Sequence, residues 1–384
     1  MLIYRKLAGR AQAVNHCLNK LISGLLVIMA LCLPSFLPAQ VNKPEQRQYR
    51  LINADQLQMN KYMNEYVTNL RGNVVFYYGK TQFKADQAEI FDQQKTVILR
   101  GNVRIKEDTL TFYADNAYYY RNDEYIKAFG RCKVREDHKD NTYRELMAHQ
   151  MEFYRNRGDL YANDNVVLYE QKDNLHAKSG YAEYNLNTGY GYLIRNPLIW
   201  QKAKDDSLSI KAEKIEFFKQ TGKMIASFDV VTKSKDMHSK SDFLVYYMNE
   251  GKAQYFGKPM LFSDFGDAQA ENISVFFKDN KISHAHMQDS CKIVFAEEKN
   301  KEKNNWIASD QIEVKWENDK LSYFAAKENV RSYILQAQKK KQLPMNNYAT
   351  AKELQISFDE NQKIDKINLK SQVKGKYAFI YIYQ

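Results

Sequence analysis

The chain is poor in cysteine, proline and glycine. Its 384 residues include only 4 Cys, 6 Pro and 15 Gly, and after residue 40 the only cysteines are Cys132 and Cys291. This excludes a small domain held together by disulfides, and a chain of this length can bury a sizeable core without such staples. Long apolar runs are also absent after residue 40, whereas 28 Tyr and 20 Phe favour β-strands. We therefore expect an all-β protein.

Motifs that carry catalysis or cofactor binding are missing as well. The sequence has no GxSxG, no phosphate-binding glycine loop, no CxxC and no paired carboxylates in a glycine-rich turn. His284 and His286 are separated by one residue, but two imidazoles without a third ligand are more often strand histidines than a metal site. We expect no enzymatic activity, no catalytic residues, no bound metal and no cofactor.

The first 39 residues resemble a secretory signal peptide. A basic region ending at Lys20 precedes an apolar run over residues 21–37, and a cleavage site follows at Ala39. Residues 40–48 would then form a linker. The alternative is an uncleaved membrane anchor, because about 17 apolar residues lie at the lower edge of a spanning length.

The net charge of +11 comes from 57 Lys and Arg against 46 Asp and Glu, spread along the chain. Such a distribution fits contact with anionic material, and it fits a solvated surface equally well. Export from the cytoplasm and the lack of a nucleic-acid motif argue against nucleic acid as a partner.

One unit of two strands recurs along the chain. Its clearest copy is residues 99–120, LRGNVRIKEDTLTFYADNAYYY, with a turn at Glu107-Asp108. Both strands alternate apolar and polar residues, as half-buried strands do. In the second strand the alternation skips one position between Ala114 and Ala117. A regular strand cannot keep one face buried across such a skip, so we predict a bend or bulge at Asp115-Asn116.

The skipped alternation occurs ten times, with apolar or small residues at i, i+2, i+5 and i+7. The second of these residues is always alanine or serine: Ala54, Ala85, Ala114, Ala148, Ser179, Ala212, Ser241, Ala270, Ser309 and Ala351. A period of about 30 residues is typical of a stack in which each unit buries its face against its neighbours. We therefore expect one continuous repeat domain over residues 49–384, clearest over 49–184 and divergent over 185–384.

An acidic residue follows the small residue in seven of the ten copies, at Asp55, Asp86, Asp115, Glu213, Asp242, Glu271 and Asp310. A calcium site needs several oxygen ligands that converge in one loop, which single carboxylates spread over the repeats do not provide. We therefore favour a structural role at the bend, where a short acidic side chain can bond nearby backbone amides or face water.

Cys132 and Cys291 occupy the same repeat position as the inward-facing Val74, and they lie five repeats apart. That separation is too great for a disulfide, so we expect two buried free thiols. Pro197 and Pro259 take this position in later copies. Because proline has no N–H to donate, strand pairing should open locally at these two residues.

Repeats of the form LRGNVxF followed by TxFxADxAxI resemble the OstA-like, or LptA-type, lipopolysaccharide-transport family. The resemblance is sharpest over residues 70–120 and persists as a periodicity to the C-terminus. It implies an elongated β-jellyroll stack of bent antiparallel strands, located in the periplasm and free or associated with the outer or the inner membrane. Ten repeats exceed the need of a short bridge protein, so the chain resembles an extended member without a membrane barrel.

The resemblance implies an apolar groove that shields lipid acyl chains without catalysis during outer-membrane assembly. The residues expected to line it are Val74, Phe76, Phe83, Ile90, Val103, Ile105, Phe112 and Tyr119. The implied partners are lipopolysaccharide or a similar acylated envelope lipid, and other jellyroll transport components or copies of the chain joined through strand edges. The alternative is a structural envelope scaffold that assembles by strand addition and has a filled interior.

Overall fold

A computed structural model describes residues 48–379, with gaps at 173, 203–206, 235–236, 264–265, 279–280, 296–302, 318–319, 337–344 and 359–363. The described residues form strands and no helix, which confirms the predicted all-β class. Accordingly, they include no helix suited by length and hydropathy to cross a membrane. The predicted signal peptide and, apart from Gln48, the predicted linker lie outside the described residues.

The described residues fall into two compact units. The N-terminal unit contains residues 48–199 and 214–222, and the C-terminal unit contains residues 200–213 and 223–379. One continuous repeat domain over residues 49–384 stays a prediction.

The strands of the N-terminal unit are β1 (Tyr49–Asn53), β2 (Gln56–Tyr62), β3 (Glu65–Tyr78), β4 (Thr81–Phe91), β5 (Thr96–Glu107), β6 (Leu110–Tyr120), β7 (Tyr125–Asp137), β8 (Tyr143–Tyr154), β9 (Asp159–Glu170), β10 (Leu175–Asn185), β11 (Tyr190–Ile194) and β14 (Lys214–Phe218). Strand β12 (Leu198–Lys202) spans the boundary of the two units in the sequence. The strands of the C-terminal unit are β13 (Ser207–Lys211), β15 (Lys223–Lys233), β16 (Met237–Tyr247), β17 (Lys252–Phe256), β18 (Met260–Ser263), β19 (Gly266–Gln269), β20 (Asn272–Lys278), β21 (Lys281–Phe295), β22 (Asn305–Glu317), β23 (Lys320–Gln336), β24 (Met345–Phe358), β25 (Ile364–Lys370) and β26 (Lys374–Phe379).

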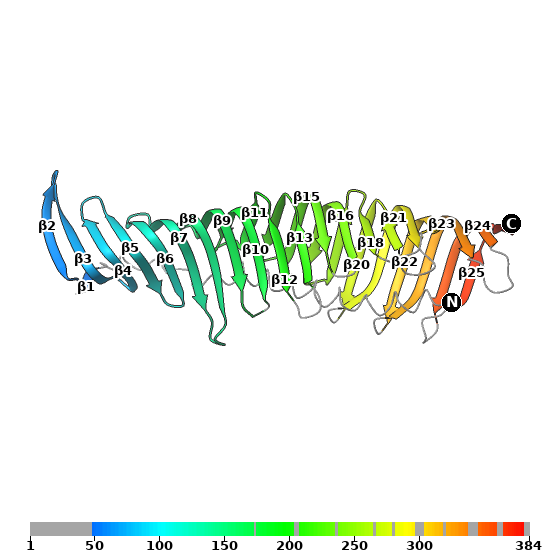
Figure 1. Cartoon of the computed structure of the whole chain (residues 1–384), viewed down its shortest axis with the longest axis horizontal. Coiled ribbons are helices and arrows are strands. Elements are labelled where there is room, and N and C mark those ends of the chain that lie inside the picture. Colours follow the sequence, from blue (N-terminus) through cyan, green and yellow to red (C-terminus); the bar gives the residue numbers. More distant parts are fainter. Residues whose placement is uncertain are drawn as a thin grey trace, which may run out of the picture. The chain divides into compact units, whose positions relative to one another are not determined.

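The long strands pair antiparallel with their neighbours in the sequence, and they bend. In the N-terminal unit, β3 to β10 follow one another in chain order (Figure 1). The register of each pair shifts once, for example between Arg71 and Val74 in β3. On the two sides of the shift in β4, the buried residues are Phe83 and Ala85, then Ala88 and Ile90. The predicted skipped alternation is therefore confirmed.

In alternate strands, two consecutive residues in the left-handed conformation build the bend. Gly101 and Asn102 have φ angles of 73° and 46°, a region that glycine and asparagine enter more readily than other residues. The equivalent pairs are Gly72–Asn73, Gly130–Arg131, Asp164–Asn165, Arg195–Asn196, Phe228–Asp229, Gly257–Lys258, Asp289–Ser290, Glu328–Asn329 and Ser371–Gln372. The predicted bend at Asp115-Asn116 does lie at the register shift. The left-handed residues, however, belong to the strands on either side of it.

In four repeats the acidic residue binds the bend of the following strand. Asn102 Nδ2 donates a hydrogen bond to Asp86 Oδ2 at 2.9 Å. The same contact recurs from Asn73 to Asp55, from Arg131 to Asp115 and from Asn329 to Asp310. A Cβ atom added at Gly101 would collide with the Asp86 carboxylate. These acidic residues are structural, as predicted, but their partner is the next strand rather than their own backbone.

The bend divides each strand into two arms, and in the N-terminal unit the arms form two layers. Layer A contains residues 87–91, 96–100, 116–120, 125–129, 150–154, 159–163, 181–185, 190–194 and 214–218. Layer B contains residues 74–78, 81–85, 103–107, 110–114, 132–137, 143–148, 166–170 and 175–179.

The two layers face each other across an apolar core. The ring of Phe83 in layer B lies 5.3 Å from that of Tyr119 in layer A, centroid to centroid. Phe112 in layer B is likewise 5.8 Å from Phe153 in layer A. The fold is thus the predicted β-jellyroll of bent antiparallel strands.

The predictions for the cysteines and prolines are confirmed. Cys132 and Cys291 are free and buried. Around Pro197 the chain leaves β11 at Ile194 and enters β12 at Leu198, and around Pro259 β17 ends before β18 begins. Each proline therefore interrupts a strand.

The first repeat differs from the others. Its apolar residues Ile52, Leu57 and Met59 are 54%, 55% and 60% exposed. Among the described strands, β1 and β2 pair only with β3. A repeat with a neighbour on one side alone buries less of its apolar face.

Candidate functional site

The residues predicted to line a groove lie in the core between layers A and B. Seven of the eight are at most 7% exposed, namely Val74, Phe76, Phe83, Ile90, Val103, Ile105 and Tyr119. Phe112 is half-buried. These positions share the inward face of the bent strands.

A small cavity brings four of these residues together. It has a volume of about 60 Å³, and Phe83, Ile105, Phe112 and Tyr119 line it. Leu110, Ile126 and Phe153 complete its apolar wall. The other four predicted residues, Val74, Phe76, Ile90 and Val103, belong to the same core but do not line this cavity.

Aromatic rings occupy much of the interior around the cavity. Phe76 and Phe83 are stacked with their centroids 5.0 Å apart, and Phe83 also contacts Tyr119. An apolar cavity of about 150 Å³ can bind a benzene molecule. The cavity of about 60 Å³ is too small for a long acyl chain, so a chain could enter only if the layers moved apart.

The layer ends opposite the bends form the mouth of the interior, and Arg155 spans this mouth. Arg155 lies in the turn after β8 and donates a hydrogen bond to Glu107 at the end of β5. Its second terminal nitrogen donates to Glu124 at 3.4 Å, and Thr81 Oγ1 donates to Glu107 at 3.1 Å. All four residues line the cavity. An ion pair that joins layer A to layer B therefore closes the apolar space.

Arg121 makes a second connection across the mouth. Its guanidinium lies 4.9 Å from the ring centroid of Tyr49 and 5.8 Å from that of Tyr78. It also pairs with Asp92 at 3.1 Å. Tyr78 in turn contacts Tyr119 with centroids 6.2 Å apart. Arg121 thus connects the turns of layer A with Tyr49 and Tyr78, which lie at strand ends on the opposite side of the mouth.

Sequence reasoning missed both arginines, because they lie in turns where polar residues are expected. One signal was available. Each arginine directly follows the last tyrosine of a strand with the skipped alternation, in the tripeptides Tyr-Arg-Asn at 120–122 and 154–156. A repeated arginine beside a strand-end aromatic ring can stack on aromatic rings and reach a carboxylate at once.

A row of buried charges lies on the inner face of layer B further along the unit. Strand register places Arg144 between Glu136 and Glu170, which are all at most 6% exposed. Glu136 Oε2 and Arg144 Nη1 are 3.9 Å apart. Burial raises the pKa of Glu136 to about 7, and the attraction of Arg144 offsets this only in part. Between β7 and β9 the interior therefore holds these charged groups beside buried apolar residues such as Leu146 and Leu168.

Residues 84–223 match the family model described as "LptA/(LptD N-terminal domain) LPS transport protein". This region of the chain is therefore similar to the LptA/LptD N-terminal family. Among solved structures, the chain is similar to LptH, "the LptA homologous periplasmic component of the conserved lipopolysaccharide transport device from Pseudomonas aeruginosa". The identity is 13% and the TM-score 0.28, over 30% of this chain and 82% of that one. No curated protein matches the chain.

The LptA/LptD N-terminal region includes much of the candidate site. Ile105, Phe112 and Tyr119 of the cavity lie within it, as do Glu107 and Arg155 of the mouth. Phe83 directly precedes its first residue. The family match, which comes from sequence, and the cavity, which comes from geometry, thus coincide on the same strands.

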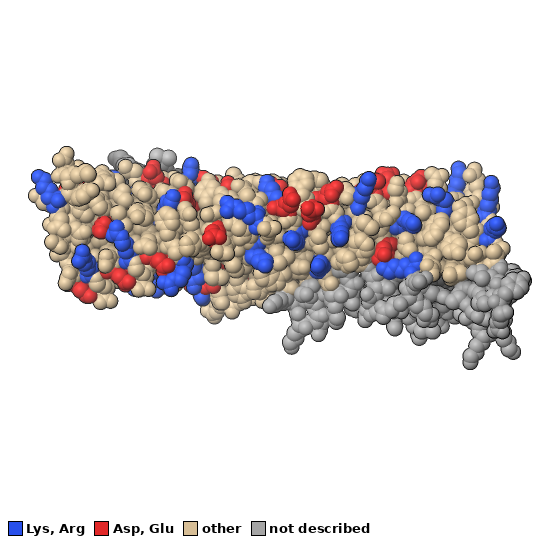
Figure 2. All heavy atoms as spheres, turned by 45° about the horizontal axis from the view of Figure 1, so that its top comes forward, with Lys and Arg blue, Asp and Glu red and all other residues tan. Residues whose placement is uncertain are grey.

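The outer surface around this region carries both signs of charge. Figure 2 shows basic and acidic residues interspersed on the described surface rather than gathered into one patch. Neighbouring strands are joined by ion pairs such as Arg100–Glu89 at 2.6 Å and Lys133–Glu145 at 3.2 Å.

His284 stacks on Phe276 at 4.2 Å. No group of three or more metal-ligating side chains is found among the described residues.

Proposed function

We propose that the protein is a noncatalytic lipopolysaccharide-binding transport protein of the periplasm that shields acyl chains between layers A and B. The observation that carries the proposal is the apolar cavity lined by Phe83, Ile105 and Phe112, which overlaps the LptA/LptD N-terminal region. Each methylene removed from water contributes about 0.8 kcal/mol. A lipid with several acyl chains therefore gains strongly from an apolar interior.

Binding requires the layers to separate at the mouth. Separation breaks the contact between Arg155 and Glu107, while the bends opposite the mouth continue to join the two arms of each strand. An incoming acyl chain replaces ring contacts such as that of Phe112 with Phe153. The free energy of opening is thus offset by burial of the chain against the same side chains.

The partners proposed beside the lipid are other jellyroll transport components or copies of this chain. The first repeat supports this, because β1 and β2 expose Ile52, Leu57 and Met59. A strand from a partner could extend the sheet there and cover these residues.

A structural scaffold with a filled interior is the second candidate function. The stacked rings of Phe76 and Phe83 and the small volume of the cavity favour it. In a scaffold these side chains form a permanent core, and no lipid enters. The two functions differ in whether Phe112 ever contacts an acyl chain.

Photo-crosslinking in cells distinguishes the two. A benzophenone amino acid is placed at Phe112, which lines the cavity, or at Tyr113, which lies on the outer face beneath Lys133. Transport predicts a lipopolysaccharide adduct from position 112 and none from position 113. If positions 83, 112 and 119 all gave no adduct in a folded protein, the acyl-chain proposal would fail and the scaffold would be favoured.

A further inference from the structure

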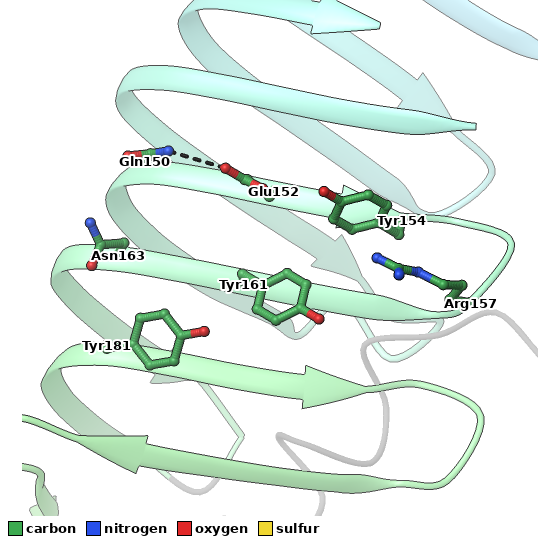
Figure 3. Close-up of a pocket in the computed structure, with 7 residues that line it drawn as sticks. All are labelled: Gln150, Glu152, Tyr154, Arg157, Tyr161, Asn163 and Tyr181. Carbon is green, nitrogen blue, oxygen red and sulfur yellow. Dashed lines mark hydrogen bonds between the residues drawn. The ribbon is translucent and has the colours of Figure 1, made fainter. Parts of the chain in front are cut away.

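A second hollow lies on the outer face of layer A, where the proposed function makes no use of it. Its volume is about 340 Å³, which lies within the range of small-molecule sites. It extends over β8, β9 and β10 and is bordered by the turn that carries Arg157 (Figure 3). It is separate from the interior cavity, because Leu160 and Ala162, the neighbours of Tyr161, are buried on the opposite face.

Three tyrosines form the floor of this hollow. Tyr154, Tyr161 and Tyr181 come from three neighbouring strands and are half-buried (Figure 3). The rings of Tyr154 and Tyr161 are perpendicular, with centroids 6.0 Å apart. The Arg157 guanidinium lies 4.0 Å from the ring centroid of Tyr154. The floor is therefore aromatic and held in place by its neighbours.

Polar groups are arranged beside the rings. Gln150 donates a hydrogen bond to Glu152 at 3.2 Å, and Arg195 donates one to Asn163 at 2.9 Å. Burial tends to raise the pKa of Glu152, but hydrogen bonds from Lys127 and Tyr125 outweigh it and lower that pKa. Glu152 is thus a carboxylate, with oxygens that can accept hydrogen bonds from a ligand.

We propose that this hollow binds the sugar rings of an oligosaccharide. A pyranose has an apolar C–H face that can lie on a tyrosine ring, and its hydroxyls can pair with carboxylate, amide and guanidinium groups. An acyl chain would cover these polar groups and offer them no hydrogen bonds. A polyanion would meet Glu152 and Asp159, which offset the charge of Lys127 and Arg157.

The inference extends the proposed function. It rests on that function only in taking lipopolysaccharide as the source of the sugar. A lipopolysaccharide whose acyl chains lie between the layers also carries a saccharide that must be accommodated in water. The alternative source is the glycan of the cell wall. Both glycans present sugar rings with apolar C–H faces and hydroxyl groups to Tyr154, Tyr161 and Tyr181.

Calorimetric titration of the whole protein tests the site with two lipid-free probes. One is the oligosaccharide released from lipopolysaccharide by mild acid, and the other is a set of peptide-free peptidoglycan glycan fragments. We expect binding of at least one probe. Tyr161→Ala should weaken this binding about tenfold, whereas Tyr161→Phe, which keeps the ring, should retain most of the affinity.

Tyr118→Ala is the matched control, because Tyr118 is a half-buried tyrosine of layer A that does not line the hollow. It should bind the probe as the parent protein does. Binding of neither probe, or equal binding by Tyr161→Ala and the parent, overturns the proposal. Because the probes lack acyl chains, this outcome would leave the crosslinking result at Phe112 unaffected, and the two proposals fail separately.

Discussion

Arg155 and Glu107 are 48 residues apart in the sequence, yet their side chains meet across the mouth between layers A and B. The arginine is 25% exposed and the glutamate 24%, so water screens the pair only in part. The contact lies at the apolar cavity that Phe112 and Phe153 also line, and these two rings contact each other. The mouth is therefore held by this ion pair and its neighbour Glu124, beside the second connection made by Arg121.

We predict that Arg155→Ala opens the mouth. Loss of the hydrogen bonds to Glu107 and Glu124 should destabilise the N-terminal unit by about 1–3 kcal/mol. Amide hydrogen exchange at the adjoining ends of β5 and β8 should accelerate, and binding of a fluorescent fatty acid should become faster.

The control for this variant is Arg100→Ala, which removes an ion pair within layer A. Arg100 is 42% exposed and binds Glu89 on the neighbouring strand. It should leave exchange at the mouth and the rate of fatty-acid binding unchanged. Equal rates in Arg155→Ala and the parent protein would show that this ion pair does not limit access.

Glu136 should make stability depend on pH. Its folded-state pKa of about 7 lies above the ordinary value of 4.5, so the folded protein binds more protons between these values. The stabilisation that follows from the raised pKa of Glu136 is complete at low pH and is lost as the pH rises through about 7. The free energy of unfolding falls by at most about 3 kcal/mol as a result. Glu136→Gln should remove this fall, measured as the difference in unfolding free energy from the parent between pH 5 and pH 8.

Arg144 faces Glu136, and Arg144 also lies beside Glu170 and His138. Burial lowers the pKa of His138, and so does the nearby Arg144. Asp108→Asn, in the exposed turn after β5, is the control and should keep the parent slope. If the Glu136→Gln profile ran parallel to that of the parent, the glutamate would be ionised in both states and its burial would not set the slope.

The inward-facing residues were predictable because strand alternation has a period of two. Phe83, Ala85, Ala88 and Ile90 are buried as the skipped pattern requires, and the same pattern placed Cys132 in the core. The bend of β6 was predicted at Asp115-Asn116, where the register does shift. The sequence pattern shows where the alternation of buried residues is interrupted. The left-handed backbone lies instead at Gly101-Asn102 of the neighbouring strand, because glycine adopts positive φ angles with little strain.

The mouth could not be predicted from alternation, since Arg155 and Glu107 lie at strand ends and meet through the layer arrangement. The outer hollow was missed for a similar reason. Tyr154, Tyr161 and Tyr181 alternate outward on separate strands, and only the register of β8, β9 and β10 brings them together. Contacts across strands depend on register, which the sequence of each strand alone does not report.

The two buried thiols should react slowly in the folded protein. Burial raises the pKa of Cys132 to about 11 and that of Cys291 to about 12, so little thiolate forms near neutral pH. After treatment with iodoacetamide at pH 8, mass spectrometry should find both residues unmodified in the native protein and both alkylated in denaturant. A cysteine placed at the exposed Lys80 should react at once. Rapid native alkylation of Cys132 would instead indicate frequent opening of β7.

Gly101 combines a left-handed φ of 73° with contact against the Asp86 carboxylate. An alanine there is strained by its backbone, and its methyl group also displaces the carboxylate that binds Asn102. We predict that Gly101→Ala destabilises the protein by about 1–3 kcal/mol, measured by thermal unfolding.

Gly375→Ala is the matched control, because its added Cβ would have no heavy atom closer than 3.7 Å, and it should be close to neutral. Asn102→Gly keeps the left-handed backbone and removes only the hydrogen bond to Asp86. It should therefore cost less than Gly101→Ala, and the reverse order would show that the hydrogen bond, rather than the backbone, holds the bend.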